Sequence, residues 1–187
     1  MRIGSRDFAT TGHTYIMGIL NVTPDSFSDG GKFNQIDAAL KHAEEMIRDG
    51  ADVIDIGGES TRPGYTKISD EEETDRVVPV IEAVKKEFGI PISVDTYKSG
   101  VAEAAAQAGA DLINDIWGLK YDPHMSEVIA KSGLACCLMH NRDNTEYRNF
   151  MEDVKQDLRE TIALAKAAGI ADDKIILEPG VGFAKSY

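Results

Sequence analysis

The chain contains 187 residues, of which 42% are hydrophobic, and its formal net charge at pH 7 is −12. This length suits one domain, and the negative charge argues against a nucleic-acid partner because phosphates would be repelled. No apolar run is long enough to cross a bilayer, and the N-terminal stretch MRIGSRDFATTGHTY lacks the apolar segment of a signal peptide. We therefore expect a cytoplasmic protein with no membrane partner.

Short apolar runs rich in β-branched residues alternate along the chain with longer segments rich in Ala, Glu and Lys. The runs are continuously apolar, which is typical of parallel strands covered on both faces. We predict strands at 15–23, 53–58, 91–96, 112–116, 134–140 and 174–180. We predict helices over about 34–49, 69–88, 98–108, 122–132 and 149–168. The residues before the first strand could form a short hairpin or plug.

Local signals support this alternation of strands and helices. Ser69 and Glu72 form the capping pattern S-x-x-E at the start of the second helix. The segments DGADVIDIG (49–57) and AGADLINDI (108–116) form a weak internal repeat. In both copies we expect Gly to end a helix in a left-handed cap, three residues before the next strand begins.

Six units of this kind leave two architectures, a doubly wound sheet and a (β/α)₈ barrel. Polar residues decide between them, because one lies at or near the carboxyl end of each predicted strand. They are Asn21, Asp55, Asp95, Asn114, His140 and Glu178. A doubly wound sheet concentrates polar function at one switch point, whereas a barrel draws on every strand. We therefore predict one domain over 1–187 that contains about six of the eight units of a TIM (β/α)₈ barrel.

The sequence argues against several common site chemistries. It contains no G-x-x-x-x-G-K-[ST] phosphate-binding loop, and its four histidines lack metal-site spacing. Cys136 and Cys137 are neighbours in a predicted strand, so their side chains should point to opposite faces and fill the core rather than pair.

Two buried acids and two loops favour a binding site instead. Asp55 and Asp95 lie in apolar strands, where a carboxylate is costly to desolvate unless something pairs with it. One such acid could simply bond to loop backbone, but polar groups on successive strand ends favour function. The loops NVTPDSFSDGG and GGESTRPG can bring backbone N–H groups to an anion, and Arg62 adds a cation. The same loop composition also suits plain turns, and this alternative stays open.

Five segments, in this order, carry a resemblance to one family: MGILNVTPDSFSDGG, DIGGESTRPG, ISVDTYKS, LINDIWG and EPGVGFAK. They resemble dihydropteroate synthase of the folate pathway, and the similarity runs over the whole chain. The resemblance implies a (β/α)₈ barrel that joins 6-hydroxymethyl-7,8-dihydropterin pyrophosphate to p-aminobenzoate. Such a transferase forms 7,8-dihydropteroate, releases pyrophosphate, uses Mg²⁺ and binds sulfonamides in its p-aminobenzoate site.

The resemblance also implies roles for individual residues. Asn21 would hold Mg²⁺ on the pyrophosphate. Asp95 and Asn114 would hydrogen-bond the edge of the pterin ring, together with Glu178, which stands where the family usually has Asp. The other residues implied in substrate binding lie on later strand ends and in three loops. They are Ser26, Phe27, Asp55, Thr61, Arg62, Ile116, Met139, Phe183 and Lys185.

Within that set, Ile116 and Met139 would pack on the faces of the pterin. Two loops, which contain Ser26-Phe27 and Thr61-Arg62, would close over the pyrophosphate and build the p-aminobenzoate pocket. Phe183 and Lys185 would lie beside that pocket.

The chain departs from the family pattern at Glu178 and in its length. The family's strands seven and eight are missing, as are the helices that usually build its homodimer interface, so we expect an incomplete barrel with open edges. One alternative is a pterin-binding fragment that turns over nothing. Another is a pterin methyltransferase that acts on methyltetrahydrofolate, which shares the barrel but lacks the TPDSFSDGG and GGESTRPG loops. The partners that we expect are the two small-molecule substrates.

Overall fold

The computed structural model describes residues 1–23, 32–60 and 66–185 of the chain. Within these residues, six parallel strands form one sheet. They are β3 (Met17–Asn21), β4 (Val53–Gly57), β5 (Ile92–Asp95), β6 (Leu112–Asp115), β7 (Ala135–Met139) and β8 (Ile175–Glu178). All six lie within the predicted strand ranges.

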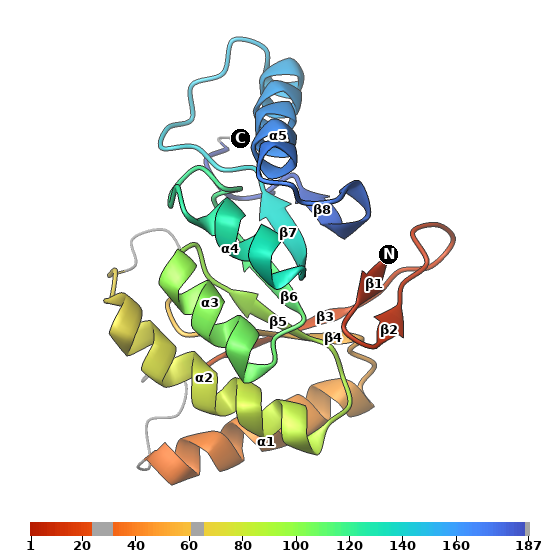
Figure 1. Cartoon of the computed structure of the whole chain (residues 1–187), viewed down its shortest axis with the longest axis vertical. Helices are drawn as coiled ribbons and strands as arrows, with labels where there is room; N and C mark the ends of the chain where they lie inside the picture. Colours follow the sequence, from red (N-terminus) through yellow and green to blue (C-terminus); the bar gives the residue numbers. More distant parts are fainter. Residues whose placement is uncertain (24–31, 61–65, 186–187) are drawn as a thin grey trace.

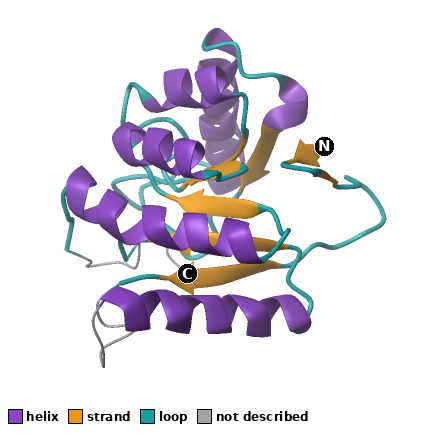
Figure 2. Cartoon of the chain, turned by 60° about the horizontal axis from the view of Figure 1, so that its bottom comes forward, coloured by secondary structure: helices purple, strands orange, loops and turns teal. Residues whose placement is uncertain are grey.

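The strands pair in chain order, β3-β4-β5-β6-β7-β8. In a doubly wound sheet the order in which strands are added reverses at a switch point, and in this sheet it does not. Helices follow its strands and line the outside of the curved sheet (Figure 1, Figure 2). They are α1 (Lys32–Arg48), α2 (Asp70–Glu87), α3 (Ser99–Ala108), α4 (Met125–Ser132) and α5 (Phe150–Ala167), with a short 3₁₀ turn at Asp172–Lys174. The architecture is the predicted arc of six units of a TIM barrel.

The helix ends form by the predicted local chemistry. The side chain of Ser69 accepts a hydrogen bond of 3.1 Å from the backbone N–H of Glu72 at the start of α2. The carboxylate of Glu72 pairs with Arg76 instead of completing the capping box. Gly50 and Gly109 both have φ of 108°, a left-handed conformation that lets each helix stop sharply before the next strand.

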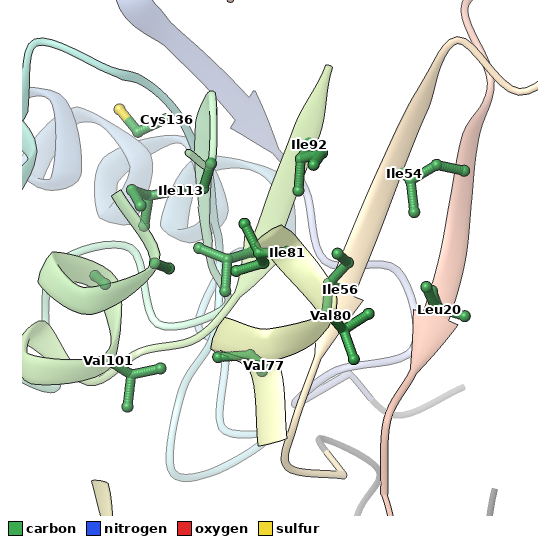
Figure 3. Close-up of a cluster of buried hydrophobic side chains, with 14 of the residues drawn as sticks. Leu20, Ile54, Ile56, Val77, Val80, Ile81, Ile92, Val101, Ile113 and Cys136 are labelled. Atoms are coloured by element: carbon green, nitrogen blue, oxygen red, sulfur yellow. The ribbon is translucent and has the colours of Figure 1, made fainter. Parts of the chain in front are cut away.

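The main apolar core lies between the sheet and its helices. Leu20 and Ile56 from the strands, with Val77 and Ile81 from α2, belong to one cluster of buried side chains (Figure 3). Burial of this kind contributes about 1.5–3 kcal/mol for each large side chain. The layer fixes the outer face of the strands, so that their other face is left to line the barrel interior.

A second apolar cluster closes the amino-terminal end of the barrel interior. The antiparallel hairpin of β1 (Arg2–Ile3) and β2 (Arg6–Asp7) places Ile3 and Phe8 against Val53, Leu112, Ala135 and Cys137. The hairpin is therefore the predicted plug. Cys136 belongs to the outer cluster and Cys137 to this inner one, and both are free and buried, as the alternation of side chains predicted.

The strands β3 and β8 are the outer strands of the described sheet, and each pairs on one side only. Ile19 on β3 is 63% exposed and Leu177 on β8 is 38% exposed. The sequence predicted that β8 is buried on both faces, whereas the structure leaves it half-exposed because only β7 lies beside it. Among the described helices, none combines the length and the apolar character that crossing a membrane requires.

Candidate active site

Four residues lie in one row across the carboxyl ends of β3 to β6. Asn21 pairs in register with Gly57, Gly57 with Asp95, and Asp95 with Asn114. A Cβ atom at Gly57 would lie 3.5 Å from both Asn21 Oδ1 and Asp95 Oδ2. The absence of a side chain at Gly57 therefore leaves a gap that the amide of Asn21 and the carboxylate of Asp95 flank from two sides.

Asp55 lies below this row and faces the same interior. Its Oδ2 atom accepts a hydrogen bond of 3.1 Å from Nδ2 of Asn114, and the residue is 4% exposed. Burial raises the pKa of Asp55. Within the described part of the chain, Asn114 Oδ1 is a buried acceptor with no hydrogen-bond donor, whereas Asp55 also has the hydroxyl of Ser93 beside it as a donor. An acceptor without a donor is costly to bury unless a ligand supplies the missing donor.

Glu178 brings a second carboxylate to this interior from the end of β8. It is half-buried and lies opposite Met139 in register. Burial, and next the charge of Asp55, raise the pKa of Glu178. The Sγ atom of Cys137 lies 4.0 Å from Glu178 Oε2. The structure thus places Asp55, Asn114 and Glu178 around one space, as expected of a site that binds a ligand with several N–H donors.

An apolar wall stands beside these acceptors. Tyr97, Ile116 and Met139 form a buried cluster, and the partly buried Trp117 and Phe183 pack against it. Tyr97 follows β5, Ile116 follows β6 and Met139 ends β7, so three successive strand ends contribute to one apolar cluster. Ile116 and Met139, which the sequence assigned to the faces of a pterin, belong to this wall together with Phe183.

Four predicted site residues, Ser26, Phe27, Thr61 and Arg62, lie outside the residues that the structure describes. Lys185 is described, and its ammonium makes internal contacts. It donates a hydrogen bond of 2.7 Å to the carbonyl of Phe183 and lies 3.0 Å from Nδ1 of His140. His140, which follows β7, is 2% exposed and is held between Lys185 and α5 rather than open to the interior.

A buried ion network next to the site was not predicted from the sequence. The ammonium of Lys98 lies 2.9 Å from Glu59 and 2.6 Å from Glu73, and it donates a hydrogen bond of 2.8 Å to the carbonyl of Ile68. The hydroxyl of Tyr97 also donates to Glu59. Burial lowers the pKa of Lys98, but its hydrogen bonds to the two carboxylates outweigh burial and raise it. No pattern within one segment signals this network, because its members come from three separate segments.

The donor set around Asn21 fits a weakly held Mg²⁺ ion. Mg²⁺ prefers oxygen ligands and is often bound by one or two protein groups together with substrate phosphates and water. Asn21 supplies an amide oxygen on one side of the gap at Gly57, and Asp95 supplies a carboxylate on the other. In residues 1–23, 32–60 and 66–185 there is no cluster of three or more His, Cys, Asp or Glu side chains that could hold a metal by themselves.

The fold and the site together indicate the class of protein. A parallel α/β barrel sheet carries carboxylate and amide acceptors at the carboxyl ends of its strands, beside an apolar wall. This arrangement suits an enzyme that binds a flat heterocycle with N–H donors along its edge.

Comparisons with known proteins give the family. The sequence model of a family described as pterin binding enzymes matches residues 17–187. The dihydropteroate synthase of Clostridium beijerinckii is 64% identical over 187 residues, which cover 100% of this chain and 70% of that protein. The chain therefore belongs to the pterin binding enzyme family, among the dihydropteroate synthases.

Solved structures agree with this assignment. The crystal structure of dihydropteroate synthase from Clostridium difficile in the presence of pteroic acid matches with a TM-score of 0.90 and 50% identity, over 100% of this chain and 68% of that one. Xanthomonas albilineans dihydropteroate synthase with 4-aminobenzoic acid matches with a TM-score of 0.86 and 44% identity, over 92% of this chain and 63% of that one.

Proposed function

We propose that the protein condenses 6-hydroxymethyl-7,8-dihydropterin pyrophosphate with p-aminobenzoate to form 7,8-dihydropteroate and pyrophosphate. The observation that carries this proposal is the group of polar acceptors at the strand ends. Asn114 Oδ1 is a buried acceptor for which the described residues offer no donor, Asp55 is a buried carboxylate beside it, and the half-buried Glu178 is close enough for the charge of Asp55 to raise its pKa. A pterin edge offers the adjacent N–H donors that such acceptors need.

The proposed roles follow from position. Glu178, at the rim, accepts two N–H groups of the pterin with the fork of its carboxylate, and Asp95 and Asn114 bind the opposite edge. Ile116 and Met139 hold the ring faces by apolar contact. Phe183 stands at the outer side of the wall, where the aromatic ring of p-aminobenzoate would bind.

The reaction needs no nucleophile from the protein. The amine nitrogen of p-aminobenzoate forms a bond to the pterin methylene carbon, the C–O bond to pyrophosphate breaks, and the amine loses a proton. The pterin ring can stabilise positive charge on that carbon, so bond breaking can run ahead of attack. Cys137 faces the interior, but burial raises the pKa of its thiol to about 12, so it stays a neutral thiol. The protein then contributes positioning and electrostatics.

We propose Asn21 as the Mg²⁺ ligand, since its amide oxygen borders the gap at Gly57 that the carboxylate of Asp95 also borders. Bound Mg²⁺ would neutralise charge on the leaving pyrophosphate. We also propose that the protein works in the cytoplasm. Its two free, buried cysteines suit a reducing compartment.

The test is product formation by the protein at the full length that its gene encodes. We expect 7,8-dihydropteroate by mass spectrometry, and pyrophosphate release only when both substrates are present. Asn114→Leu removes the amide with little change in size, and should lower kcat/KM by about 100-fold because it removes one hydrogen-bond donor to Asp55 and leaves the pterin edge without its partner. Lys131→Met, a change in an exposed ion pair, is the control.

A protein that forms no dihydropteroate from both substrates would contradict the proposal. A second candidate is pterin binding without turnover, which the exposed outer strands favour. Calorimetry with the dihydropterin substrate separates the two, because binding without product formation supports only the second.

A further inference from the structure

A line of hydrogen-bonded side chains runs from helix α5 to the turn that follows β8. Asp157 Oδ2, on α5, lies 2.8 Å from His140 Nε2, and His140 Nδ1 lies 3.0 Å from the ammonium of Lys185. Lys185 also donates a hydrogen bond of 2.7 Å to the carbonyl of Phe183. The side chain of His140 is 0% exposed and that of Asp157 is 15% exposed, so little water competes for these contacts.

The chemistry of the groups fixes the direction of every hydrogen bond in this line. The Nε atom of Arg142 donates to the same Asp157 oxygen at 2.6 Å, and the hydrogen bonds from Arg142 and His140 outweigh burial and lower the pKa of Asp157. An ionised carboxylate only accepts, so His140 must carry its proton on Nε2. Nδ1 is then an acceptor, and Lys185 is its donor. Burial lowers the pKa of His140, which keeps the ring neutral, as this arrangement requires.

The turn that Lys185 fastens is strained and closely packed. Gly180, Gly182 and Ala184 have φ of 64°, 93° and 48°, all left-handed. A non-glycine residue in this region costs about 1–2 kcal/mol. A Cβ atom at Gly180 would lie 2.2 Å from the carbonyl oxygen of His140, so the turn presses directly on the end of β7. Such a turn needs contacts with other parts of the chain to keep its conformation. The hydroxyl of Tyr147 provides one, since it donates a hydrogen bond of 2.8 Å to the carbonyl of Ala184.

The turn carries Phe183 to the apolar wall. We propose that Asp157, His140 and Lys185 are positioning residues, which fix the turn 180–185 and thereby hold the Phe183 ring where the aromatic amine substrate binds. This inference rests on the proposed function, since that function supplies the substrate. Lys185 acts here through its two internal hydrogen bonds rather than as a direct ligand of substrate charge.

Asp157→Ala in the full-length protein tests the proposal. Alanine suits the helix, but it removes the acceptor of the Nε2 proton of His140. The donor from Lys185 still favours the Nε2–H tautomer, but the ring is no longer held from the side of α5, so its hydrogen bond to Lys185 weakens. We expect a KM for p-aminobenzoate about 10-fold higher, since one charge-assisted hydrogen bond is lost. We expect kcat and the KM for the pterin substrate to stay within about twofold.

Three further measurements separate positioning from general damage. The ¹H–¹⁵N spectrum of labelled histidine should show that the Nε2–H group of His140 loses its hydrogen bond in Asp157→Ala. Asp157→Asn should recover most of the affinity, because its amide oxygen can still accept from both donors. Lys185→Met should raise the same KM, and adding Asp157→Ala to it should raise that KM no further.

Glu160→Ala is the matched control, because Glu160 lies one turn along α5 and pairs with Lys120 at 3.3 Å. It should change neither KM nor the His140 spectrum. The proposal is overturned if Asp157→Ala leaves the KM for p-aminobenzoate unchanged in an active protein, or if its effect adds fully to that of Lys185→Met. If the wild type itself makes no dihydropteroate, the proposed function fails. The Nε2–H signal of His140 then decides the positioning proposal by itself, since an unchanged signal in Asp157→Ala overturns it.

Discussion

Glu178 carries its carboxylate one methylene farther from the backbone than an Asp, the residue that the resemblance implies at this place. One C–C bond adds about 1.5 Å, and a misplacement of about 1 Å can cost roughly 100-fold in rate. The half-buried position at the outer strand β8 gives this side chain room to adopt a compensating rotamer. The residue should therefore bind pterin by its two oxygens in the manner of an Asp.

Glu178→Gln tests this role. The amide keeps one acceptor and turns an N–H group toward a pterin N–H, so we expect pterin affinity to fall by about 1–3 kcal/mol, or roughly 5-fold to 150-fold. Isothermal calorimetry on the full-length protein measures it. Glu178→Asp is the control and should bind within about threefold of the wild type, since both carboxylate oxygens remain. If Glu178→Gln binds pterin as tightly as the wild type, Glu178 does not bind the pterin edge.

Asp115, at the end of β6, should make the free energy of unfolding fall as pH rises. Its oxygens accept hydrogen bonds of 2.8 Å and 2.7 Å from the N–H groups of Trp117 and Leu119, but burial dominates and raises its pKa to about 6. The folded state therefore binds a proton more tightly than the unfolded state, whose pKa is 3.8. This contribution is complete below pH about 4 and is lost as pH rises through about 6.

The pKa of Asp115 is raised by about two units on folding, and this shift corresponds to about 3 kcal/mol of stability. We expect the free energy of unfolding of the wild type to fall by up to this amount from pH 4 to pH 7, relative to Asp115→Asn, whose side chain does not titrate. Urea unfolding of both proteins at the two pH values measures the difference. A constant difference between them would show that Asp115 keeps an ordinary pKa.

At the scale of elements, the network of Lys98, Glu59 and Glu73 joins the loop after β4, the start of α2 and the loop after β5. Lys98→Met would leave two carboxylates buried without their cation, so we expect a loss of about 3–5 kcal/mol of stability. Chemical denaturation of the full-length protein measures it. Adding Glu59→Gln and Glu73→Gln should restore part of the loss by removing the charges. Lys131→Met, in a pair with Glu103 whose Lys is 77% exposed, should stay within about 0.5 kcal/mol.

The elements themselves could be predicted because their signals are local. Apolar runs, the Ser69 cap and the glycines at 50 and 109 each act within a few residues, and the structure follows them. The row from Asn21 to Asn114 could also be predicted, since parallel strands of a barrel end at the same rim. Contacts such as Lys98 with Glu59 could not, because they depend on the exact spacing between loops that no single segment encodes.

The whole sheet is an arc that has a closed side and an open side. The hairpin plug and the helices cover the amino-terminal end and the outer face, through the two buried apolar clusters. Along the outer strand β3, Met17 and Ile19 are 37% and 63% exposed. Outer strands with free N–H and C=O groups and apolar side chains are templates for pairing with another chain.

We therefore predict that this 187-residue chain, expressed alone, associates through β3 and β8. Light scattering coupled to size exclusion should give masses above 20.3 kDa that grow with concentration. Ile19→Lys places a charge on the open edge and should shift the chain toward the monomer. Leu164→Lys, an equal change at a 44% exposed residue within α5, should not, because the backbone groups there are paired inside the helix, as the hydrogen bond of 3.1 Å from Ala168 N–H to the Leu164 carbonyl shows. A monodisperse monomer at about 100 μM would mean that the exposed edges are protected by their own twist or charge.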